Sequence, residues 1–269
     1  FDRFLLNFLQ EDDFLFLRSL GVNMIRLPFN YTYFIDDQDP SGYRDDGFRY
    51  LDHVIGLCEK HRIYAILDMH AAPGGQNPDW HSDNVTGIPQ FWHYRVFREQ
   101  MTGLWRHIAE HYRDNPWVAY DILNEPFFIP DKSILFAFYD KTIAAIREVD
   151  RDHVIFLEGD HFAMDFDGFP PPQDSRVTFE FHYYPQVWDA TVMEKEREDR
   201  RIVLKQALAH MLDIREKYNI PLWCGEFGCV YEDQRMDFYT EFLQDTIDVF
   251  EEEDISWALW AYKDSKSMG

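Results

Sequence analysis

The sequence contains few cysteines. Only Cys58, Cys224 and Cys229 are present among 269 residues, and this odd number shows neither CxxC nor zinc-ligand spacing. We therefore predict no disulfide framework and expect packing to stabilise the fold. Residues 1–20 show no basic segment followed by an apolar one, so no signal peptide is visible. Low cysteine use fits either compartment, and the localisation, extracellular or cytoplasmic, stays open.

Basic residues and long apolar runs are also scarce. Lys and Arg number 26 against 49 Asp and Glu, which gives a formal net charge of −23. Binding to nucleic acid or anionic lipid needs clustered Lys and Arg, so the charge argues against both partners. Apolar runs such as VIFL at 154–157 are far shorter than the roughly 18 to 20 residues of a membrane span. We expect a soluble protein without a membrane partner that binds a neutral ligand.

Short β-rich runs alternate with amphipathic stretches, a pattern typical of repeated βα units with a parallel sheet. The predicted strands cover 22–29, 64–71, 118–125, 153–159, 177–184, 222–228 and 256–263. The predicted helices cover 11–20, 47–61, 89–113, 133–149, 201–218 and 235–252. This order predicts an α/β fold, a (β/α)8 TIM barrel, formed by residues 1–269 as a single domain.

A barrel of this class needs eight strands, and seven are visible. We therefore expect the chain to lack the first strand and possibly the last helix. An incomplete barrel exposes sheet edges, through which copies of the chain could self-associate.

Polar residues follow the predicted strands, where a barrel would bring them to one central pocket. Two of these strand ends carry an isolated carboxylate, Glu125 in NEP at 124–126 and Glu226 in GEFG at 225–228. An ionisable group beside a hydrophobic strand is costly unless it is paired or has a function. Glycoside hydrolysis needs two such groups, one acid and one carboxylate, whose separation decides between retention and inversion. The sequence does not give that separation.

The ordered motifs resemble glycoside hydrolase family 5, within the larger clan of retaining barrel glycosidases. NEP at 124–126, HYY at 182–184 and GEFG at 225–228 carry the resemblance, together with IRLP at 25–28, APGGQN after His70 and a terminal WxYK. The resemblance covers nearly the whole chain. Two departures, Tyr262 where many relatives have Trp and the distinctive loop DMHAAPGGQNPDWHSDN, leave the details of sugar recognition open.

The resemblance implies catalytic roles for two residues, Glu125 as acid/base and Glu226 as nucleophile. It also implies that Asn124 binds the sugar 2-hydroxyl, an interaction that strengthens in the oxocarbenium-like transition state. Arg26 is expected near Glu226, where it would favour the ionised carboxylate.

Four further residues are implied to bind substrate or support the nucleophile. His70 and His182 resemble the two pocket histidines of the family, Tyr184 resembles the tyrosine that hydrogen-bonds the nucleophile, and Trp260 resembles the platform beneath the sugar. We expect hydrolysis of β-glucosidic bonds in β-glucans or related β-glucosides, with an oligo- or polysaccharide as substrate and with no cofactor or metal. β-Mannan and glycolipid remain alternatives.

Other interpretations of these residues stay open. The two glutamates could form a structural ion pair with Arg26, and Glu158 or Asp160 could line the pocket. A metal site from His70, His81, Asp83 and Glu125 is conceivable because histidine and carboxylate bind zinc. A noncatalytic carbohydrate-binding barrel is an alternative from another functional class.

Overall fold

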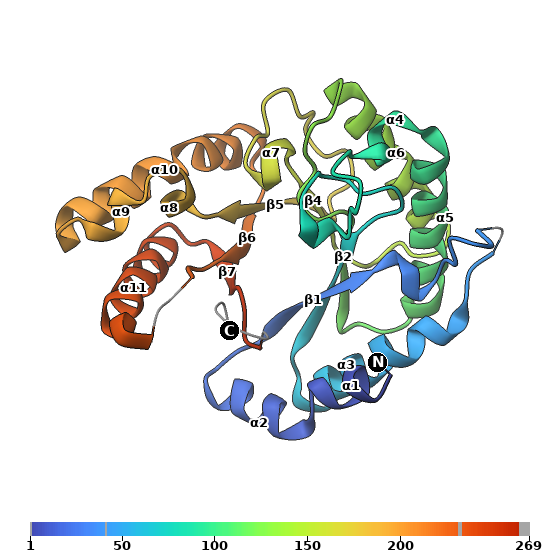
Figure 1. The fold of residues 1–269 in the computed structure, drawn as a ribbon, viewed down its shortest axis with the longest axis horizontal. Coiled ribbons are helices and arrows are strands. Elements are labelled where there is room, and N and C mark those ends of the chain that lie inside the picture. The colour runs from blue at the N-terminus through green and yellow to red at the C-terminus, as the bar shows by residue number, and fades with distance from the viewer. Residues whose placement is uncertain (1, 41, 231–232, 264–269) are drawn as a thin grey trace. The chain divides into compact units, whose positions relative to one another are not determined.

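The computed structural model describes residues 2–40, 42–230 and 233–263. The chain forms two compact parts, one up to Val177 and one from Thr178 onward. Strands and helices alternate along each part (Figure 1). The prediction that the whole chain is a single domain stays a prediction.

The first part contains four parallel strands. They are β1 (Met24–Asn30), β2 (Tyr64–Ala71), β3 (Val118–Asp121) and β4 (Ile155–Glu158). Each pairs with the next strand along the chain. Because parallel neighbours point the same way, the loops that follow these strands lie at the same edge of the sheet.

The strands of the first part are joined mainly by helical segments. These are α1 (Asp2–Phe8), α2 (Glu11–Ser19), η1 (Tyr31–Tyr33), η2 (Asp45–Gly47), α3 (Phe48–His61), η3 (Trp80–Ser82), α4 (Gln90–His93), α5 (Arg95–Tyr112), α6 (Lys132–Arg147) and α7 (Asp160–Ala163). Local side chains fix several helix starts. At α6, the Asp131 carboxylate accepts a hydrogen bond from the Ser133 backbone N–H at 2.8 Å, which satisfies a donor that the first turn leaves unpaired. Helices α5 and α6 pack side by side (Figure 1).

The second part contains three parallel strands and their helices. The elements are β5 (Val177–Tyr183), α8 (Pro185–Trp188), α9 (Thr191–Glu194), α10 (Arg197–Tyr218), β6 (Leu222–Phe227), η4 (Asp233–Arg235), α11 (Met236–Glu252) and β7 (Ser256–Leu259). Strand β6 pairs with both β5 and β7. Helices α10 and α11 are joined by a buried ion pair between Arg200 and Asp245, whose closest atoms are 2.5 Å apart.

Each part has an aromatic core. In the first part, the fully buried indole of Trp105 packs near Phe29 and Tyr120 and donates from Nε1 to the Ile122 carbonyl at 2.8 Å. In the second part, the buried ring of Phe250 packs edge-on against Phe227. Buried aromatic rings contribute most of the apolar area that drives such packing.

All seven predicted strands are present, and the six predicted helical regions contain helices. One helix prediction was wrong in detail, since 89–113 is two helices separated at Tyr94. The backbone of Tyr94 is extended (φ −116°, ψ 117°), so this residue begins α5 and cannot continue α4. Helix α1 was not predicted. The predicted strand 118–125 ends early, at Asp121, which places Asn124 and Glu125 in a loop.

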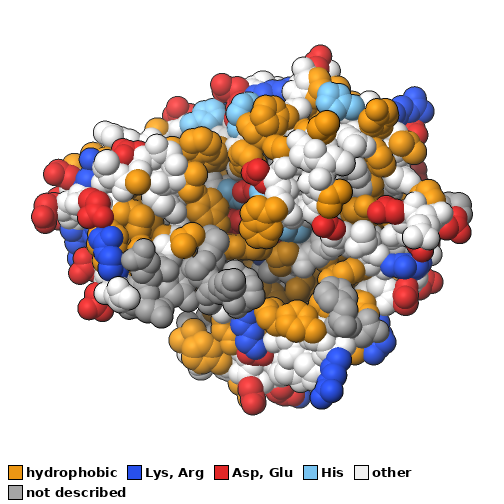
Figure 2. All heavy atoms as spheres, in the orientation of Figure 1, with side chains coloured by type: hydrophobic (Ala, Val, Ile, Leu, Met, Phe, Trp, Pro, Cys, Tyr) orange, Lys and Arg blue, Asp and Glu red, His pale blue; other side chains and the backbone are white. Residues whose placement is uncertain are grey.

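The face of the molecule drawn in Figure 2 carries Asp and Glu side chains at many separate places, interspersed with Lys and Arg. This distribution agrees with the large negative formal charge. Among the helices of the described ranges, none is long and apolar enough to cross a membrane.

Candidate active site

A buried arginine organises the carboxyl end of the first sheet. The guanidinium of Arg26, in β1, contacts carboxylate oxygens from three further strands: Asp68 at 3.1 Å, Asp121 at 2.9 Å and Glu158 at 3.0 Å. All four side chains are nearly inaccessible to solvent. Buried charges persist only when they are paired and hydrogen-bonded, so these contacts fix the strand ends relative to one another. This geometry favours the interpretation of Arg26 as part of a supporting network, and a direct contact with substrate stays a prediction.

Asn124 is held by the same arginine. Its side-chain Oδ1 accepts a hydrogen bond from Arg26 Nη2 at 2.8 Å, and the residue is fully buried. Because Oδ1 faces a donor, the amide orientation is fixed and Nδ2 must point elsewhere. Nδ2 has no hydrogen-bond partner among the described residues. The side chain therefore presents an unused donor, which suits the predicted bond to a sugar hydroxyl.

Glu125 follows Asn124 in a strained backbone conformation. Its φ of 47° lies in the left-handed region, which non-glycine residues rarely adopt. The backbone N–H donates to Glu158 Oε2 at 2.5 Å, and the backbone carbonyl accepts from Asn77 Nδ2 at 3.0 Å. Asn77 from the loop after β2 and Glu158 from β4 thus hold the peptide groups of Glu125. A strained residue persists only when its surroundings fix it in this way.

The loop after β2 clamps this segment. Gln76 donates from Nε2 to the carbonyls of His70 and Asn124, at 2.8 and 2.9 Å, and its Oε1 accepts from the Ala72 N–H at 3.0 Å. Gln76 and Asn77 are fully buried. The sequence gives no role to the individual residues of APGGQN, and in the structure its last two residues hold Asn124 and Glu125.

A buried tyrosine supports Glu158 in turn. Burial raises the pKa of Tyr139 well above its ordinary value, so its hydroxyl keeps its proton. That hydroxyl donates to the Glu158 carbonyl at 2.8 Å. Glu158, which the sequence analysis considered as a residue lining the pocket, therefore connects Arg26, Tyr139 and the backbone of Glu125.

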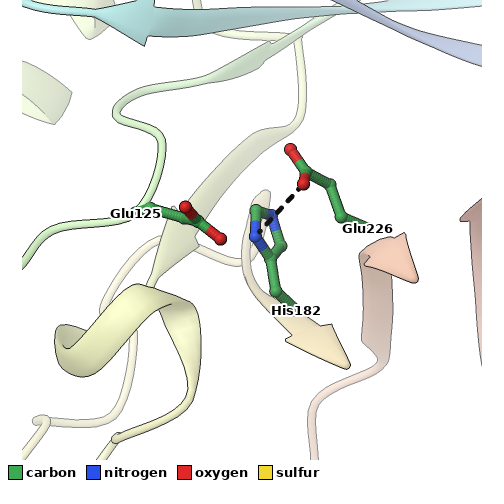
Figure 3. Close-up of side chains that lie close together, drawn as sticks. All are labelled: Glu125, His182 and Glu226. Atoms are coloured by element: carbon green, nitrogen blue, oxygen red, sulfur yellow. Dashed lines mark ion pairs between the residues drawn. The ribbon is translucent and has the colours of Figure 1, made fainter. Parts of the chain in front are cut away.

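The second carboxylate, Glu226, lies within β6 and is nearly buried. The Tyr184 hydroxyl donates to Glu226 Oε2 at 3.2 Å, as the resemblance implied. His182 is paired with Glu226 in the register of β5 and β6, and its Nδ1 lies 3.7 Å from Glu226 Oε2. Figure 3 shows this ion pair as a dashed line and, on the loop after β3, the side chain of Glu125.

Glu180 was missed by sequence reasoning. It is fully buried in β5, and its Oε1 lies 3.8 Å from His182 Nε2. A Cβ on Gly225 would lie 1.6 Å from the same oxygen. The glycine of GEFG therefore leaves room for the Glu180 carboxyl beside His182. The only sign of this residue in the sequence was an acidic side chain two positions before the HYY motif.

The other predicted site residues lie at the ends of their strands. His70 closes β2, and its Nδ1 is 2.7 Å from Asp68 Oδ2, which orients the imidazole ring. Trp260 follows β7, is partly exposed, and donates from its backbone N–H to the Phe227 carbonyl at 2.8 Å. Their contacts with a sugar stay predictions.

The four residues of the metal alternative do not converge. His70 pairs with Asp68, and the Asp83 carboxylate accepts a hydrogen bond from Asn30 Nδ2 at 3.0 Å. Over the described ranges, His70, His81, Asp83 and Glu125 do not form a cluster with ligand spacing. His81 instead forms an ion pair with Glu125, in which its Nε2 lies 2.9 Å from Glu125 Oε2.

Comparison with known proteins identifies the family. The family model described as cellulase (glycosyl hydrolase family 5) matches residues 7–266. A β-xylosidase of Phanerodontia chrysosporium is 40% identical over the whole chain, which spans 59% of the length of that relative. Endoglucanase C of Acetivibrio thermocellus is 24% identical, over 95% of this chain and 84% of its own length.

Solved structures show the fold. An endoglucanase from the hyperthermophilic Thermotoga maritima matches 97% of this chain and 84% of its own with a TM-score of 0.79, at 18% identity. The cellulose synthase subunit Z of Clostridioides difficile matches 97% of this chain and 86% of its own with a TM-score of 0.80, at 19% identity. The predicted TIM-barrel fold with seven parallel strands is confirmed.

Proposed function

The chain belongs to glycosyl hydrolase family 5, and from this premise we propose that it is a retaining glycosidase that cleaves β-glucosidic bonds in β-glucans or related β-glucosides. The observation that carries the proposal is the family match over residues 7–266, which includes Glu125 in the loop after β3 and Glu226 in β6. An oligo- or polysaccharide is the proposed substrate.

In the proposed mechanism, Glu226 attacks the anomeric carbon while Glu125 gives its proton to the leaving oxygen. The covalent glycosyl–enzyme bond forms as the glycosidic bond breaks. Glu125, now ionised, takes a proton from water, and the resulting hydroxide displaces Glu226 to release the sugar with its original configuration. The chemistry uses no redox step, and we propose no cofactor.

The contacts within each part support these roles. The Tyr184 hydroxyl donates to Glu226 Oε2 and so holds the carboxylate of the proposed nucleophile in place. Asn124 Nδ2, which has no hydrogen-bond partner within the described ranges, is a donor next in sequence to the proposed acid. Removing a donor that strengthens its bond in the transition state costs catalysis more than binding.

The anomeric form of the first product tests this proposal. We expect proton NMR of early hydrolysis of 4-nitrophenyl β-cellobioside to show the β-anomer first, with the α-anomer arising later by mutarotation. Initial release of the α-anomer would contradict retention. No hydrolysis of any glycoside by the folded chain would favour the noncatalytic carbohydrate-binding alternative.

A second candidate substrate is a β-xyloside. It is favoured by the 40% identity to a protein named β-xylosidase. A panel of 4-nitrophenyl β-glucoside, β-xyloside and β-mannoside, together with soluble β-glucan, mannan and a glucosylated lipid, separates the candidates by kcat/KM. We expect the glucoside or β-glucan to be preferred, and a tenfold preference for the xyloside would replace β-glucosidic specificity.

A further inference from the structure

A connected series of aromatic rings lies beside the carboxyl group of Glu125. The rings come from the segments that follow β2, β3 and β4, and they belong to Trp80, His81, Phe127, Phe128 and Phe162. Neighbouring rings of the series have centroids 4.3 to 6.3 Å apart. The series reaches the proposed acid/base through His81, whose Nε2 lies 2.9 Å from Glu125 Oε2. These five residues form the aromatic rim of the first part.

Backbone hydrogen bonds join the three segments that carry the aromatic rim. The Phe127 N–H donates to the Gln76 carbonyl at 3.2 Å, which ties the segment after β3 to the loop after β2. The Phe162 N–H donates to the Pro126 carbonyl at 3.2 Å, which ties the segment after β4 to the segment after β3. The rim is therefore one supported surface and not three independent loops.

Two rings of the rim are carried by strained backbone. Phe128 has a φ of 54° and Phe162 a φ of 58°, in the left-handed region that bulky residues rarely adopt. Phe128 is nevertheless 60% exposed, and Trp80 is 89% exposed. Strain of this kind gathers at sites of ligand contact, and an exposed ring gains little from burial on folding. The placement of these rings therefore points to a ligand that covers them.

The polar side chains of the loop after β2 are engaged within the protein. Asn77 Nδ2 donates to the Glu125 carbonyl at 3.0 Å. Ser82 Oγ and Asn84 Nδ2 both donate to the Asn77 carbonyl, at 3.0 and 2.8 Å. A bound sugar needs hydrogen-bond partners for its hydroxyl groups, whereas an aromatic group needs ring faces to stack on. The exposed rings of the rim therefore favour an aromatic ligand over a sugar.

The proposed chemistry places the leaving group at the same carboxyl. Glu125 gives its proton to the oxygen of the leaving group, so the atoms bonded to that oxygen lie next to Glu125. We infer that the aromatic rim binds the leaving group and that this group is an aromatic aglycone, which stacks on Trp80 and Phe128. The inference rests on the proposed function, which it narrows to β-glycosides with a non-sugar leaving group. It gives a role to Trp80 in the distinctive loop DMHAAPGGQNPDWHSDN.

Thioglycosides test this binding without turnover, because their sulfur bridge resists a hydrolysis that begins with protonation. Methyl and 2-naphthyl 1-thio-β-glucoside carry the same sugar, so the ratio of their Kd values isolates the aglycone. By isothermal titration calorimetry, we expect the naphthyl compound to bind the parent chain about tenfold more tightly than the methyl compound. In Trp80→Ala this preference should fall to about twofold.

Three further variants separate ring stacking from shape. Trp80→Phe keeps a ring and should keep a preference of about fivefold or more. Phe128→Asn removes the second ring, and asparagine tolerates a left-handed backbone, so the preference should fall to about threefold. Tyr64→Ala is the matched control, because it removes a half-exposed ring at the start of β2, the opposite end of that strand from the loop. Its preference should equal that of the parent.

Turnover gives a second readout. In Trp80→Ala, KM for 4-methylumbelliferyl β-glucoside should rise about fivefold while kcat stays within about twofold, because stacking holds the aglycone equally in the ground and transition states. For cellobiose, whose leaving group is a sugar, kcat/KM should change by less than about twofold. Thermal unfolding checks that each variant is folded.

The inference is overturned if the parent chain binds both thioglycosides equally, or if the preference survives in both Trp80→Ala and Phe128→Asn. An equal loss for cellobiose would assign the rim to a sugar, and equally tight binding of octyl 1-thio-β-glucoside would assign it to an alkyl chain. A naphthyl preference that is lost in Trp80→Ala upholds the rim even if the chain hydrolyses no glycoside. Hydrolysis with retention but no such preference upholds the proposed function and rejects the rim.

Discussion

The two proposed catalytic glutamates are held in different ways. Glu125 lies in a loop after β3 with a left-handed backbone, where Glu158 of β4 binds its N–H and Asn77 of the loop after β2 binds its carbonyl. Glu226 lies inside β6, where ladder pairing with β5 sets the backbone and Tyr184 holds the carboxylate. Side chains distant in sequence thus fix the peptide groups of Glu125, whereas strand pairing fixes the backbone of Glu226.

This difference matches the work proposed for each residue. An acid/base must exchange a proton with two partners in turn, so a loop that fixes the backbone leaves the carboxyl group able to adjust. A nucleophile must keep one oxygen in line with a carbon atom, which a rigid strand with a hydrogen-bonded carboxylate achieves. Burial also raises the pKa of the Cys224 thiol far above its ordinary value, so this neighbouring side chain in β6 adds no charge beside Glu226.

The largest effect should follow removal of the nucleophile. Glu226→Ala is expected to lose roughly 10⁴-fold or more in kcat for every leaving group, because no other group forms the covalent bond. Azide added to this variant should give an α-glycosyl azide, detected by NMR, because it enters from the vacated side. Turnover near the parent rate would show that Glu226 is not the nucleophile.

Loss of the Glu158 carboxylate should destabilise the buried network that binds the backbone of Glu125. Glu158→Gln leaves the buried Arg26 short of one negative partner, and breaking a buried pair from one side costs about 3–5 kcal/mol in the free energy of unfolding. The matched control is Glu148→Gln, whose exposed pair with Arg106 should contribute only about 0–1 kcal/mol. Urea unfolding measures both, and equal losses would mean that the buried network does not support the fold.

In the second part, close packing of Gly225 against the buried Glu180 carboxyl can be tested in the same way. Gly225→Ala would place a methyl group against the Glu180 carboxyl, and we expect a loss of about 1–3 kcal/mol in stability. Gly56→Ala, in the middle of α3 with open space around it, should instead stabilise by about 0.5–1 kcal/mol. A neutral Gly225→Ala, judged by urea unfolding, would show that Glu180 moves aside easily.

The last prediction concerns a buried pair of the first part, Asp150 and His153, and a loss of stability that depends on pH. Burial opposes ionisation of Asp150, but hydrogen bonds from His153, the Asp152 N–H and Tyr120 outweigh it and lower the pKa of Asp150. Burial also opposes charge on His153, yet the bond to Asp150 leaves the pKa of His153 raised.

These directions fix the pH dependence. Stability from the lowered Asp150 pKa is present above its unfolded value of about 3.9 and fades as pH falls through the folded value. Stability from the raised His153 pKa is present below its unfolded value of about 6.5 and fades as pH rises through the folded value. Asp150→Asn should therefore cost most, about 2 kcal/mol, between about pH 4 and 6.5. A loss that is independent of pH in urea titrations would contradict this coupling.

Much of the fold could be predicted from local patterns, since strand alternation located all seven strands. Flanking motifs singled out Glu125 and Glu226, whose catalytic roles stay predictions. The roles of Gln76, Asn77 and Glu158 could not be predicted, because each acts on a backbone group 33 to 48 residues away in sequence. The left-handed φ of Glu125 could not be predicted from the sequence for the same reason, because contacts with residues distant in sequence impose it against the local preference.

The most direct measurement of the central claim is covalent trapping. The purified chain would be incubated with 2,4-dinitrophenyl 2-deoxy-2-fluoro-β-glucoside, digested and analysed by mass spectrometry. We expect a stable 2-fluoroglucosyl ester on Glu226, because the fluorine slows both formation and hydrolysis of the intermediate, whereas the activated leaving group speeds its formation. A sugar ester on another residue, or turnover of the dinitrophenyl glucoside with no trapped ester, would contradict the account.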